Sequence, residues 1–301
     1  MSLQKRSILA AIAANAIFGL SFMFSKLALN VTEPVILLCC RFSVTLIVLN
    51  LLVFTRVMKL NLRGKNIGAA ILVGFLQPVL YFLLESYGLE YTTASFTGII
   101  ASISPVFTAI LGVIFLGEKP SPKQWFCIGL SIVGVLMISL QPGGGSNTLM
   151  GCACLLGAYL VGSGYSILIR KLSSEFTAFE LTYVMFTVGF LFFMISAFMQ
   201  YGSETFSMIG NALSHKEFLI GVLYLGALAS VGAFMMINFS FAHLPVTQAM
   251  IFGSFATIIS TLAGVFLMND PFTLRTLASF VLIFAGVTGV NIFTAKKEVH
   301  P

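Results

Sequence analysis

Long runs of apolar residues recur along the whole of this 301-residue chain. A helix needs about 20 such residues to cross the hydrocarbon core of a bilayer. Ten runs meet that length, near residues 7–29, 34–57, 66–88, 92–116, 122–140, 149–170, 179–201, 218–240, 245–267 and 273–295. Because lipid offers no partner to an unpaired backbone amide, and the runs are too long and uniform for barrel strands, each is predicted to be a helix. The expected fold is an all-α integral membrane protein with ten transmembrane helices.

The composition agrees with a membrane protein and argues against several other classes. Charged residues make up 9% of the chain and hydrophobic residues 58%, whereas a soluble protein has about 25% charged residues. The net charge of +6 comes from basic residues in short loops, so no nucleic-acid partner is expected. The five cysteines lie inside apolar runs without the spacing of a zinc site or a disulfide framework. We therefore expect no metal and no cofactor, and membrane lipids around a monomer or weak homodimer.

The distribution of basic residues predicts the orientation in the membrane, because Lys and Arg are enriched in cytoplasmic loops. With the N-terminus inside, the inner segments hold Lys5, Arg6, Arg56, Lys59, Arg63, Lys65, Lys119, Lys123, Arg170, Lys171, Lys296 and Lys297. The outer ends hold only Lys26, Lys216 and Arg275, and Arg41 lies within the second run. The first run is too long for a signal-peptide core and is expected to remain as a span. We expect a multi-pass protein of the cell (plasma) membrane with both termini in the cytoplasm.

The sequence contains a degenerate copy of itself. An offset of 152 pairs Gly112 with Gly264, Glu118 with Asp270 and Gly134 with Gly286, and an offset of 145 pairs Gly19, Ser21, Lys26 and Leu27 with Gly164, Ser166, Lys171 and Leu172. Two five-helix repeats are predicted, at 1–140 and 148–295, joined by an extracytoplasmic glycine-rich linker at 141–147 and followed by a short cytoplasmic tail at 296–301. Because five is an odd number, the second repeat must enter the membrane inverted, as in many secondary transporters.

Local signals in the fourth, fifth and ninth runs concern helix packing and helix ends. Helix-packing or hinge positions are expected at Gly98, Pro105, Gly112, Gly253 and Gly264. Two interpretations stay open: a close contact of these helices with each other or with neighbours, and a proline that frees backbone groups beside a cavity. At the fifth run, Ser121, Pro122 and Gln124 indicate an N-cap, a first-turn proline and a capping-box partner. The fifth helix is therefore expected to begin there.

Polar and aromatic residues on single helical faces predict a central cavity. A polar face in an apolar helix is expected to look toward the protein interior rather than toward lipid. The candidate substrate-binding residues are Asn15, Phe18, Phe22, Gln77, Tyr81, Glu85, Tyr159, Ser166, Phe234 and Asn238. A wall of aromatic and small side chains with few charges favours a zwitterionic or weakly charged substrate over a phosphate, which needs several converging cations.

Four ionisable residues are candidates for charge recognition or proton coupling. Glu85 either reaches water at the outer interface or lines the cavity, where it would meet a cation or carry a proton. Arg41 needs a carboxylate, a carbonyl or water nearby, with Glu85 or Glu33 as the available acids, and a structural ion pair and a substrate contact both stay open. For Lys26 we favour snorkelling to the interface. For His243 we favour simple solvation at the interface, although it could titrate near neutral pH.

Motifs for catalysis are absent from the sequence. It has no HExxH, no GxSxG, no Walker loop and no paired-aspartate motif within a run. Without an ATP-binding loop the chain is not a self-contained primary pump. A membrane-embedded enzyme acting on a lipid or prenyl substrate is the alternative, but it would need clustered acids or histidines at a membrane face, and the ten acids are dispersed. A purely structural scaffold would leave the inward polar faces unexplained.

Several segments resemble the EamA family of the drug/metabolite transporter superfamily. They are FGLSFMFSKLAL at Phe18–Leu29, Arg41, and YGLEYTTAS followed by SPVFTAILGVIFLGEKPSPKQW, within a resemblance that covers about 7–140 and 149–295. The resemblance implies a ten-helix carrier that exports or exchanges amino acids and other small metabolites. Phe18 stands where the family has tryptophan, which leaves the substrate open. Asn269-Asp270 replaces the Gly-Glu of the first repeat, so Glu118 and Asp270 are interpreted as boundary residues.

The residues and the resemblance together predict a secondary transporter and not an enzyme. It is expected to export or exchange a small-molecule substrate by alternating access around the central cavity. Two modes of transport stay open at this point: coupling to protons, with Glu85 as the leading candidate, and uncoupled facilitation.

Overall fold

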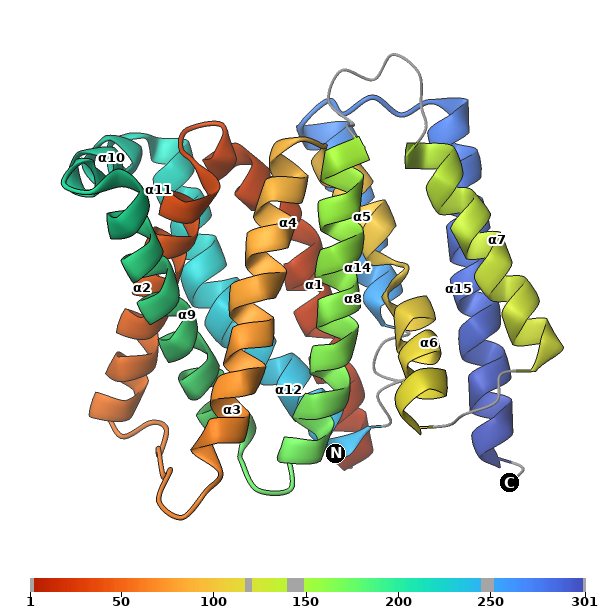
Figure 1. Cartoon of the computed structure of the whole chain (residues 1–301), viewed down its shortest axis with the longest axis horizontal. Coiled ribbons are helices and arrows are strands. Elements are labelled where there is room, and N and C mark those ends of the chain that lie inside the picture. Colours follow the sequence, from red (N-terminus) through yellow and green to blue (C-terminus); the bar gives the residue numbers. More distant parts are fainter. Residues whose placement is uncertain (1–2, 117–120, 140–148, 245–251, 300–301) are drawn as a thin grey trace.

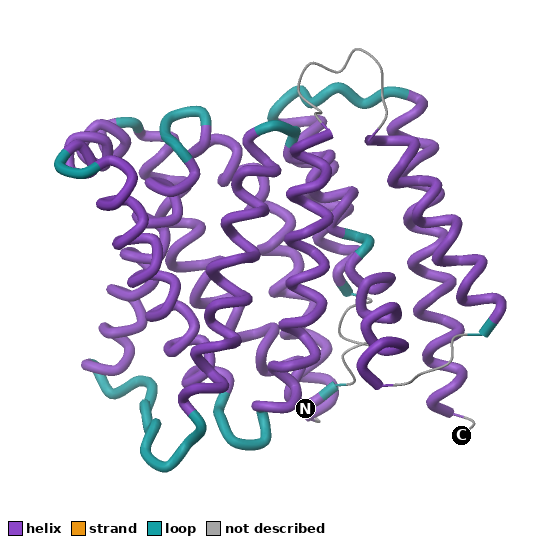
Figure 2. Tube along the Cα trace, in the orientation of Figure 1, coloured by secondary structure: helices purple, strands orange, loops and turns teal. Residues whose placement is uncertain are grey.

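The computed structural model describes residues 3–116, 121–139, 149–244 and 252–299. The described part of the chain is built from helices, and most connections between them lie at the two ends of the molecule (Figure 1, Figure 2). The helices are α1 (Leu3–Leu29), α2 (Pro34–Phe54), α3 (Ile67–Gly74), η1 (Phe75–Leu80), α4 (Tyr81–Glu90), α5 (Ala94–Ala101), α6 (Ser104–Leu116), α7 (Pro122–Ser139), α8 (Leu149–Leu172), α9 (Ala178–Tyr201), α10 (Glu204–Ser214), α11 (Lys216–Leu223), η2 (Tyr224–Ala233), α12 (Phe234–His243), α14 (Gly253–Leu267) and α15 (Leu274–Val299).

Many of these helices are long and apolar enough to cross a membrane. Seven helical segments meet that length and composition: Leu3–Leu29, Pro34–Phe54, Ile67–Glu90, Ala94–Leu111, Leu149–Leu172, Ala178–Tyr201 and Lys216–His243. Three shorter apolar helices accompany them, at Pro122–Ile138, Phe255–Leu267 and Leu274–Val290. Large apolar side chains such as Phe54 and Met199 are 86% and 83% exposed, as expected where lipid is the solvent. The chain is an all-helical, multi-pass membrane protein.

Helix boundaries follow local capping chemistry. The predicted start of the fifth helix is confirmed: α7 begins at Pro122, the Ser121 amide donates to Gln124 Oε1 over 2.7 Å, and the Gln124 amide donates to Ser121 Oγ over 3.3 Å. A second capping box begins α9, where Thr177 and Glu180 satisfy each other's backbone amides. Such reciprocal bonds pair donors that a helix N-terminus would otherwise leave free.

The third, fourth and eighth apolar runs are not uniform α-helices. The third contains the π-helix η1 around Pro78, and the eighth contains the π-helix η2. Proline lacks a backbone N–H and so removes one helical hydrogen bond. The fourth run breaks at Ser102–Ile103, just before Pro105, into α5 and α6. The short helix α10 also lies between the seventh and eighth runs, where no helix was predicted; it is amphipathic and too short for a hydropathy window to detect.

Close helix contacts occur where glycines remove the Cβ atom. A Cβ on Gly98 of α5 would lie 2.7 Å from the Cβ of Ser260 in α14. A Cβ on Gly264 would lie 2.8 Å from the Ser95 amide nitrogen, again between α14 and α5. Helices α7 and α15 pack side by side along the right of Figure 1. The expected contact between the fourth and ninth apolar runs is therefore present, with small residues at the crossing.

The core consists of two buried apolar clusters. One involves α1, α2, α3, α4, α8, α9 and α12, and includes Phe82, Tyr165 and Phe234. The other involves α5 to α8 and α15, and includes Tyr159 and Val287. All five of these residues also line one cavity. The cavity therefore lies where the two clusters meet.

Candidate functional site

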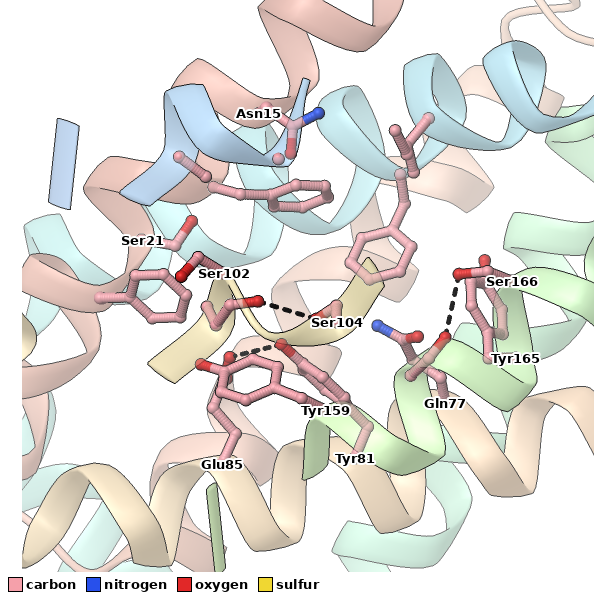
Figure 3. A pocket seen from close by; sticks show the side chains of 18 of the residues that line it. Asn15, Ser21, Gln77, Tyr81, Glu85, Ser102, Ser104, Tyr159, Tyr165 and Ser166 are labelled. Carbon is pink, nitrogen blue, oxygen red and sulfur yellow. Dashed lines mark hydrogen bonds between the residues drawn. The ribbon is translucent and has the colours of Figure 1, made fainter. Parts of the chain in front are cut away.

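A central cavity of about 170 Å³ is enclosed by segments from both halves of the chain. Since a cavity needs roughly 10–15 Å³ by this measure to admit one water, this cavity is large enough for a small ligand. Figure 3 shows its polar residues gathered from several helices. The lining comprises Asn15, Phe18, Ser21, Phe22, Arg41, Gln77, Tyr81, Phe82, Glu85, Ala101, Ser102, Ser104, Pro105, Tyr159, Gly162, Tyr165, Ser166, Phe234, Ile237, Phe241, Gly253, Ala256 and Val287.

The structure brings together every predicted substrate-binding residue except Asn238. The residues placed around the cavity are Asn15, Phe18, Phe22, Gln77, Tyr81, Glu85, Tyr159, Ser166 and Phe234. Asn238 is 2% exposed and lies outside the lining, where it accepts a hydrogen bond from Tyr165 Oη at 2.5 Å and donates to Thr182 Oγ1 at 3.0 Å. Asn238 therefore supports Tyr165, which does line the cavity, rather than facing the cavity itself.

Arg41 is the one cation that the described ranges of the chain contribute to the cavity lining, and it is 3% exposed. Its Nε donates to Ser230 Oγ over 3.0 Å, and its guanidinium lies 4.1 Å from the ring centroid of Phe82. Among the described residues its two Nη nitrogens have no hydrogen-bond partner. The contacts hold the flat group in one orientation, because an aromatic face attracts a cation within about 6 Å. Four donor hydrogens of the guanidinium stay available for a ligand.

Of the residues that the structure describes, Glu85 is the one carboxylate in the cavity lining, and it is 5% exposed. Tyr81 donates to Glu85 Oε1 over 2.9 Å, as Figure 3 shows. The charges of Glu85 and Arg41 act on each other, yet within the described part of the chain they form no direct ion pair. The expectation that Glu85 merely reaches water at the interface is not met. Glu33 does not form an ion pair with Arg41 either.

Aromatic rings form about a third of the cavity lining. Phe18 and Phe234 meet edge to face with ring centroids 5.1 Å apart, and Tyr81 and Tyr159 do so at 6.0 Å. Phe234 also lies 6.0 Å from Phe82. Such rings give a rigid wall that accommodates apolar parts of a ligand and cationic groups. The side-chain amide of Gln77 is buried beside this wall and makes no hydrogen bond to another described residue, so it is free to bind a ligand.

Several lining residues were not predicted from the sequence. They are Ser21, Phe82, Ala101, Ser102, Ser104, Gly162, Tyr165, Ile237, Phe241, Ala256 and Val287. Ser102 and Ser104 lie at the break between α5 and α6, and Ser163 Oγ donates to the Ser104 carbonyl over 3.0 Å. The signal for this break was Pro105, which disfavours a helical conformation at the residue before it. Tyr165 lacked any such signal.

Two of the four charge candidates lie outside the cavity lining. Lys26 Nζ donates to the backbone carbonyls of Leu89 and Glu90 over 2.8 and 3.0 Å. It does not snorkel freely, because it closes the C-terminal end of α4. His243 is at the end of α12, where its Nδ1 lies 2.8 Å from the Phe239 carbonyl, and it is exposed. The solvated interpretation of His243 agrees with this placement.

The five packing candidates fall into three groups. Gly98 and Gly264 lie at the α5–α14 contact. Pro105 and Gly253 line the cavity, and a Cβ on Gly253 would find its nearest neighbour, Asn15 Oδ1, at 3.9 Å. The surroundings of Gly112 lie outside the described part of the structure. Pro105 thus contributes to the cavity wall, and Gly98 and Gly264 allow the close contact between α5 and α14.

The chemistry of the site is that of binding. No group of three or more His, Cys, Asp or Glu residues that could hold a metal occurs among the described residues. The cavity joins one fixed guanidinium, one carboxylate and one free amide within an aromatic wall. Such a set can hold a small molecule of mixed polarity from several sides.

Comparison with known proteins identifies the family of this chain. Residues 5–140 and 149–292 match the EamA-like transporter family. The uncharacterized transporter YcxC of Bacillus subtilis (strain 168) is 30% identical over 99% of this chain and 96% of its own length. The uncharacterized transporter YetK of the same organism is 25% identical over 95% and 86%. A solved crystal structure has a TM-score of 0.65 at 15% identity, covering 97% of this chain and 98% of its own, which is a likeness of fold. The family and these relatives indicate a transporter rather than an enzyme, and the chain belongs to the EamA-like transporter family.

Proposed function

We propose that this protein is a secondary transporter that exports or exchanges small polar or amphipathic metabolites, such as amino acids, by alternating access around the central cavity. The observation that carries the proposal is the pair of opposite charges, Arg41 and Glu85, which line one cavity without forming a direct ion pair. Buried charges are costly unless they are paired. A zwitterionic ligand would pair both, with its anionic group on Arg41 and its cationic group on Glu85.

The remaining wall favours such a ligand over a phosphate ester. Arg41 supplies the only cation among the described residues of the lining, whereas a phosphate with up to two negative charges requires several converging donors. The aromatic groups around Phe82, Phe234 and Tyr159 accommodate an apolar side chain or the face of a cationic group. The cavity volume of about 170 Å³ is large enough for a small molecule.

A layout of ten membrane helices in two inverted five-helix repeats is part of this proposal. One support is a reciprocal contact between α7 and α15. A Cβ on Gly134 would lie 2.7 Å from Ile283, and a Cβ on Gly286 would lie 2.8 Å from the Ser131 amide nitrogen. Gly134 and Ser131 become Gly286 and Ile283 when 152 is added. Contacts that exchange partners in this way are typical of a two-fold relation.

Chain direction and charge support the inverted orientation. The N-terminus and the C-terminal end lie at the lower end in Figure 1, whereas α7 ends and α8 begins at the upper end. The loop from Thr55 to Asn66, with Arg56, Lys59, Arg63 and Lys65, is also at the lower end. Because basic loops face the cytoplasm, we assign the lower end to the cytoplasm. We propose the plasma membrane as the location of the protein.

The test is flux in proteoliposomes with three matched ligands: a neutral α-amino acid, the amine that lacks its carboxylate, and the carboxylic acid that lacks its amine. Wild-type protein is expected to show saturable flux of the zwitterion. Arg41→Gln should lower the flux of the zwitterion strongly and reduce the difference between zwitterion flux and amine flux. Glu85→Gln should also lower the flux of the zwitterion strongly and should reduce the difference between zwitterion flux and acid flux. Asn211→Asp, at an exposed position on α10 away from the cavity, is the control. No saturable flux for any metabolite, with folded protein, would refute the carrier.

A further inference from the structure

The outer end of the structure contains a cation that closes a helix of the cavity wall. Lys26 lies in the last turn of α1, and its Nζ donates to the Leu89 and Glu90 carbonyls over 2.8 and 3.0 Å. These carbonyls belong to the end of α4, where a helix leaves its last C=O groups without partners. A cation at a helix C-terminus also interacts favourably with the helix dipole. Lys26 therefore ties α1 to the end of α4.

The cytoplasmic end contains the equivalent contact in the second half. Arg170 lies in the last turn of α8, and its Nη1 donates to the Phe241 carbonyl over 3.2 Å and to the Leu244 carbonyl. These two carbonyls close the end of α12, where Leu244 is the C-cap residue. Arg170 therefore ties α8 to the end of α12, as Lys26 ties α1 to the end of α4.

The two contacts correspond under the internal repeat. Adding 152 to Leu89 gives Phe241, so the carbonyl acceptors match. Adding 145 to Lys26 gives Lys171, which is the neighbour of Arg170. Helices α1 and α8 run in opposite directions in Figure 1, and the two contacts lie at opposite ends of the molecule. Each side of the membrane thus has one contact in which a cationic side chain binds the carbonyl groups at a helix end.

In each of the two tied helices, α4 and α12, the cavity residues lie between the tied end and a π-helical segment. Segment η1 (Phe75–Leu80) precedes α4, and η2 (Tyr224–Ala233) precedes α12. Helix α4 carries Tyr81 and Glu85 of the lining, and α12 carries Phe234 and Phe241. π-helical segments mark functional sites and kinks within helices. The segments give α4 and α12 a position about which each could turn once its end is released.

We infer that Lys26 and Arg170 are paired gate latches: Lys26 holds the outer end of α4 against α1, and Arg170 holds the cytoplasmic end of α12 against α8. This inference rests on the proposed alternating-access function and assigns it two gates. The outer closure has a second contact, because the Asp270 carboxylate accepts hydrogen bonds from the Ser95 amide and hydroxyl over 2.9 and 2.7 Å. Releasing one latch opens the cavity to that side alone.

The test measures from which side a cavity residue can be reached. In a variant whose five native cysteines are replaced, Ser102→Cys places one thiol in the cavity lining. A membrane-impermeant maleimide is added to the outside or the inside of oriented proteoliposomes. Lys26→Met and Arg170→Met remove the latches. Lys216→Met and Lys171→Met are the matched controls, since both lysines are exposed and neither side chain forms a hydrogen bond with another described residue.

Hydrogen bonds to a charged group are worth about 1.5–3 kcal/mol, so loss of one latch should change the ratio of outside to inside labelling by roughly ten- to a hundredfold. Lys26→Met is expected to raise that ratio and Arg170→Met to lower it, with the double variant returning toward wild type. Lys26→Arg and Arg170→Lys should keep most of the wild-type ratio. Where a methionine variant does not fold, Lys26→Gln or Arg170→Gln gives the same readout.

The inference is overturned if Lys26→Met and Arg170→Met shift the ratio in the same direction, or no further than their controls. Because the labelling needs no transported substrate, it is independent of the flux test. Absence of flux in wild type would refute the proposed transport while the labelling still reports on the latches. Opposite shifts with normal flux support both.

Discussion

The contact between α5 and α14 offers a sharp test of helix packing next to the cavity. In Gly98→Ala the new Cβ would lie 1.6 Å from Ser260 Oγ and 2.7 Å from Ser260 Cβ. The hydroxyl can rotate away, although it would lose its 3.0 Å hydrogen bond to the Thr257 carbonyl. The Cβ–Cβ approach has no such escape, because it is fixed by the two backbones. Helices α5 and α14 must therefore move apart.

The expected cost of Gly98→Ala is about 1–3 kcal/mol of unfolding free energy, the usual range for overpacking. Two second-site changes distinguish the contribution of the Ser260 Oγ conflict from that of the Ser260 Cβ conflict. Ser260→Ala removes the Oγ conflict but keeps the Cβ conflict at 2.7 Å, whereas Ser260→Gly removes both. A double-mutant cycle should therefore give a larger rescue of Gly98→Ala with Ser260→Gly than with Ser260→Ala.

The assay is reversible unfolding in detergent micelles, followed by helical circular dichroism. Gly164→Ala is the control, since a Cβ there would meet nothing within 4 Å. Replacing a helical glycine by alanine in open space should stabilise by roughly 0.5–1 kcal/mol. If Gly98→Ala is as harmless as Gly164→Ala, or if Ser260→Gly rescues nothing, the packing assigned to these helices is wrong.

Three further predictions concern helix pairing, protons and topology. Gly286→Ala should lower the free energy of unfolding by about 1–3 kcal/mol, because its Cβ would meet the backbone oxygen of Cys127 at 2.5 Å. Gly129→Ala, in open space, should not destabilise the protein. Equal unfolding midpoints for the two variants would contradict the α7–α15 contact. If Glu85 also carries protons, the reduced zwitterion flux that remains in Glu85→Gln should no longer respond to an imposed pH gradient; an unchanged pH dependence would refute that role. Single cysteines should be labelled from outside in the 141–147 linker and from inside at both termini, and a cytoplasmic linker would break the proposed topology.

Much of the cavity could be predicted because periodicity alone distinguishes an inward face from a lipid-facing one. Gln77, Tyr81 and Glu85 recur at helical spacing, so any inward-facing helix must bring them to the same side. The same argument placed Phe22 on the wall, whereas Phe18 was expected there from the resemblance to the EamA family. Hydropathy predicted the long helices for a related reason, since a bilayer requires both length and apolar composition.

Other features depended on pairings that a single sequence does not contain. Asn238 shares the polar face of its helix, but its partners Tyr165 and Thr182 come from α8 and α9, so it faces them instead of the cavity. Lys26 has a long, flexible side chain that reaches either water or protein. Its acceptors are backbone carbonyls 63 and 64 residues away, and a backbone carbonyl is the same at every position in the sequence.

Blocking the cavity tests the central claim most directly. Gly253 lines the cavity, and among the residues that the structure describes a Cβ there would meet Asn15 Oδ1 alone, at 3.9 Å. Gly253→Phe would therefore project a ring into the space that the substrate needs. Gly129→Phe, at an exposed position with nothing within 4 Å of its Cβ, is the control. In proteoliposomes loaded for counterflow of the transported metabolite, the account predicts saturable flux for wild type and Gly129→Phe and none for Gly253→Phe. Wild-type flux through correctly folded Gly253→Phe would contradict transport through this cavity.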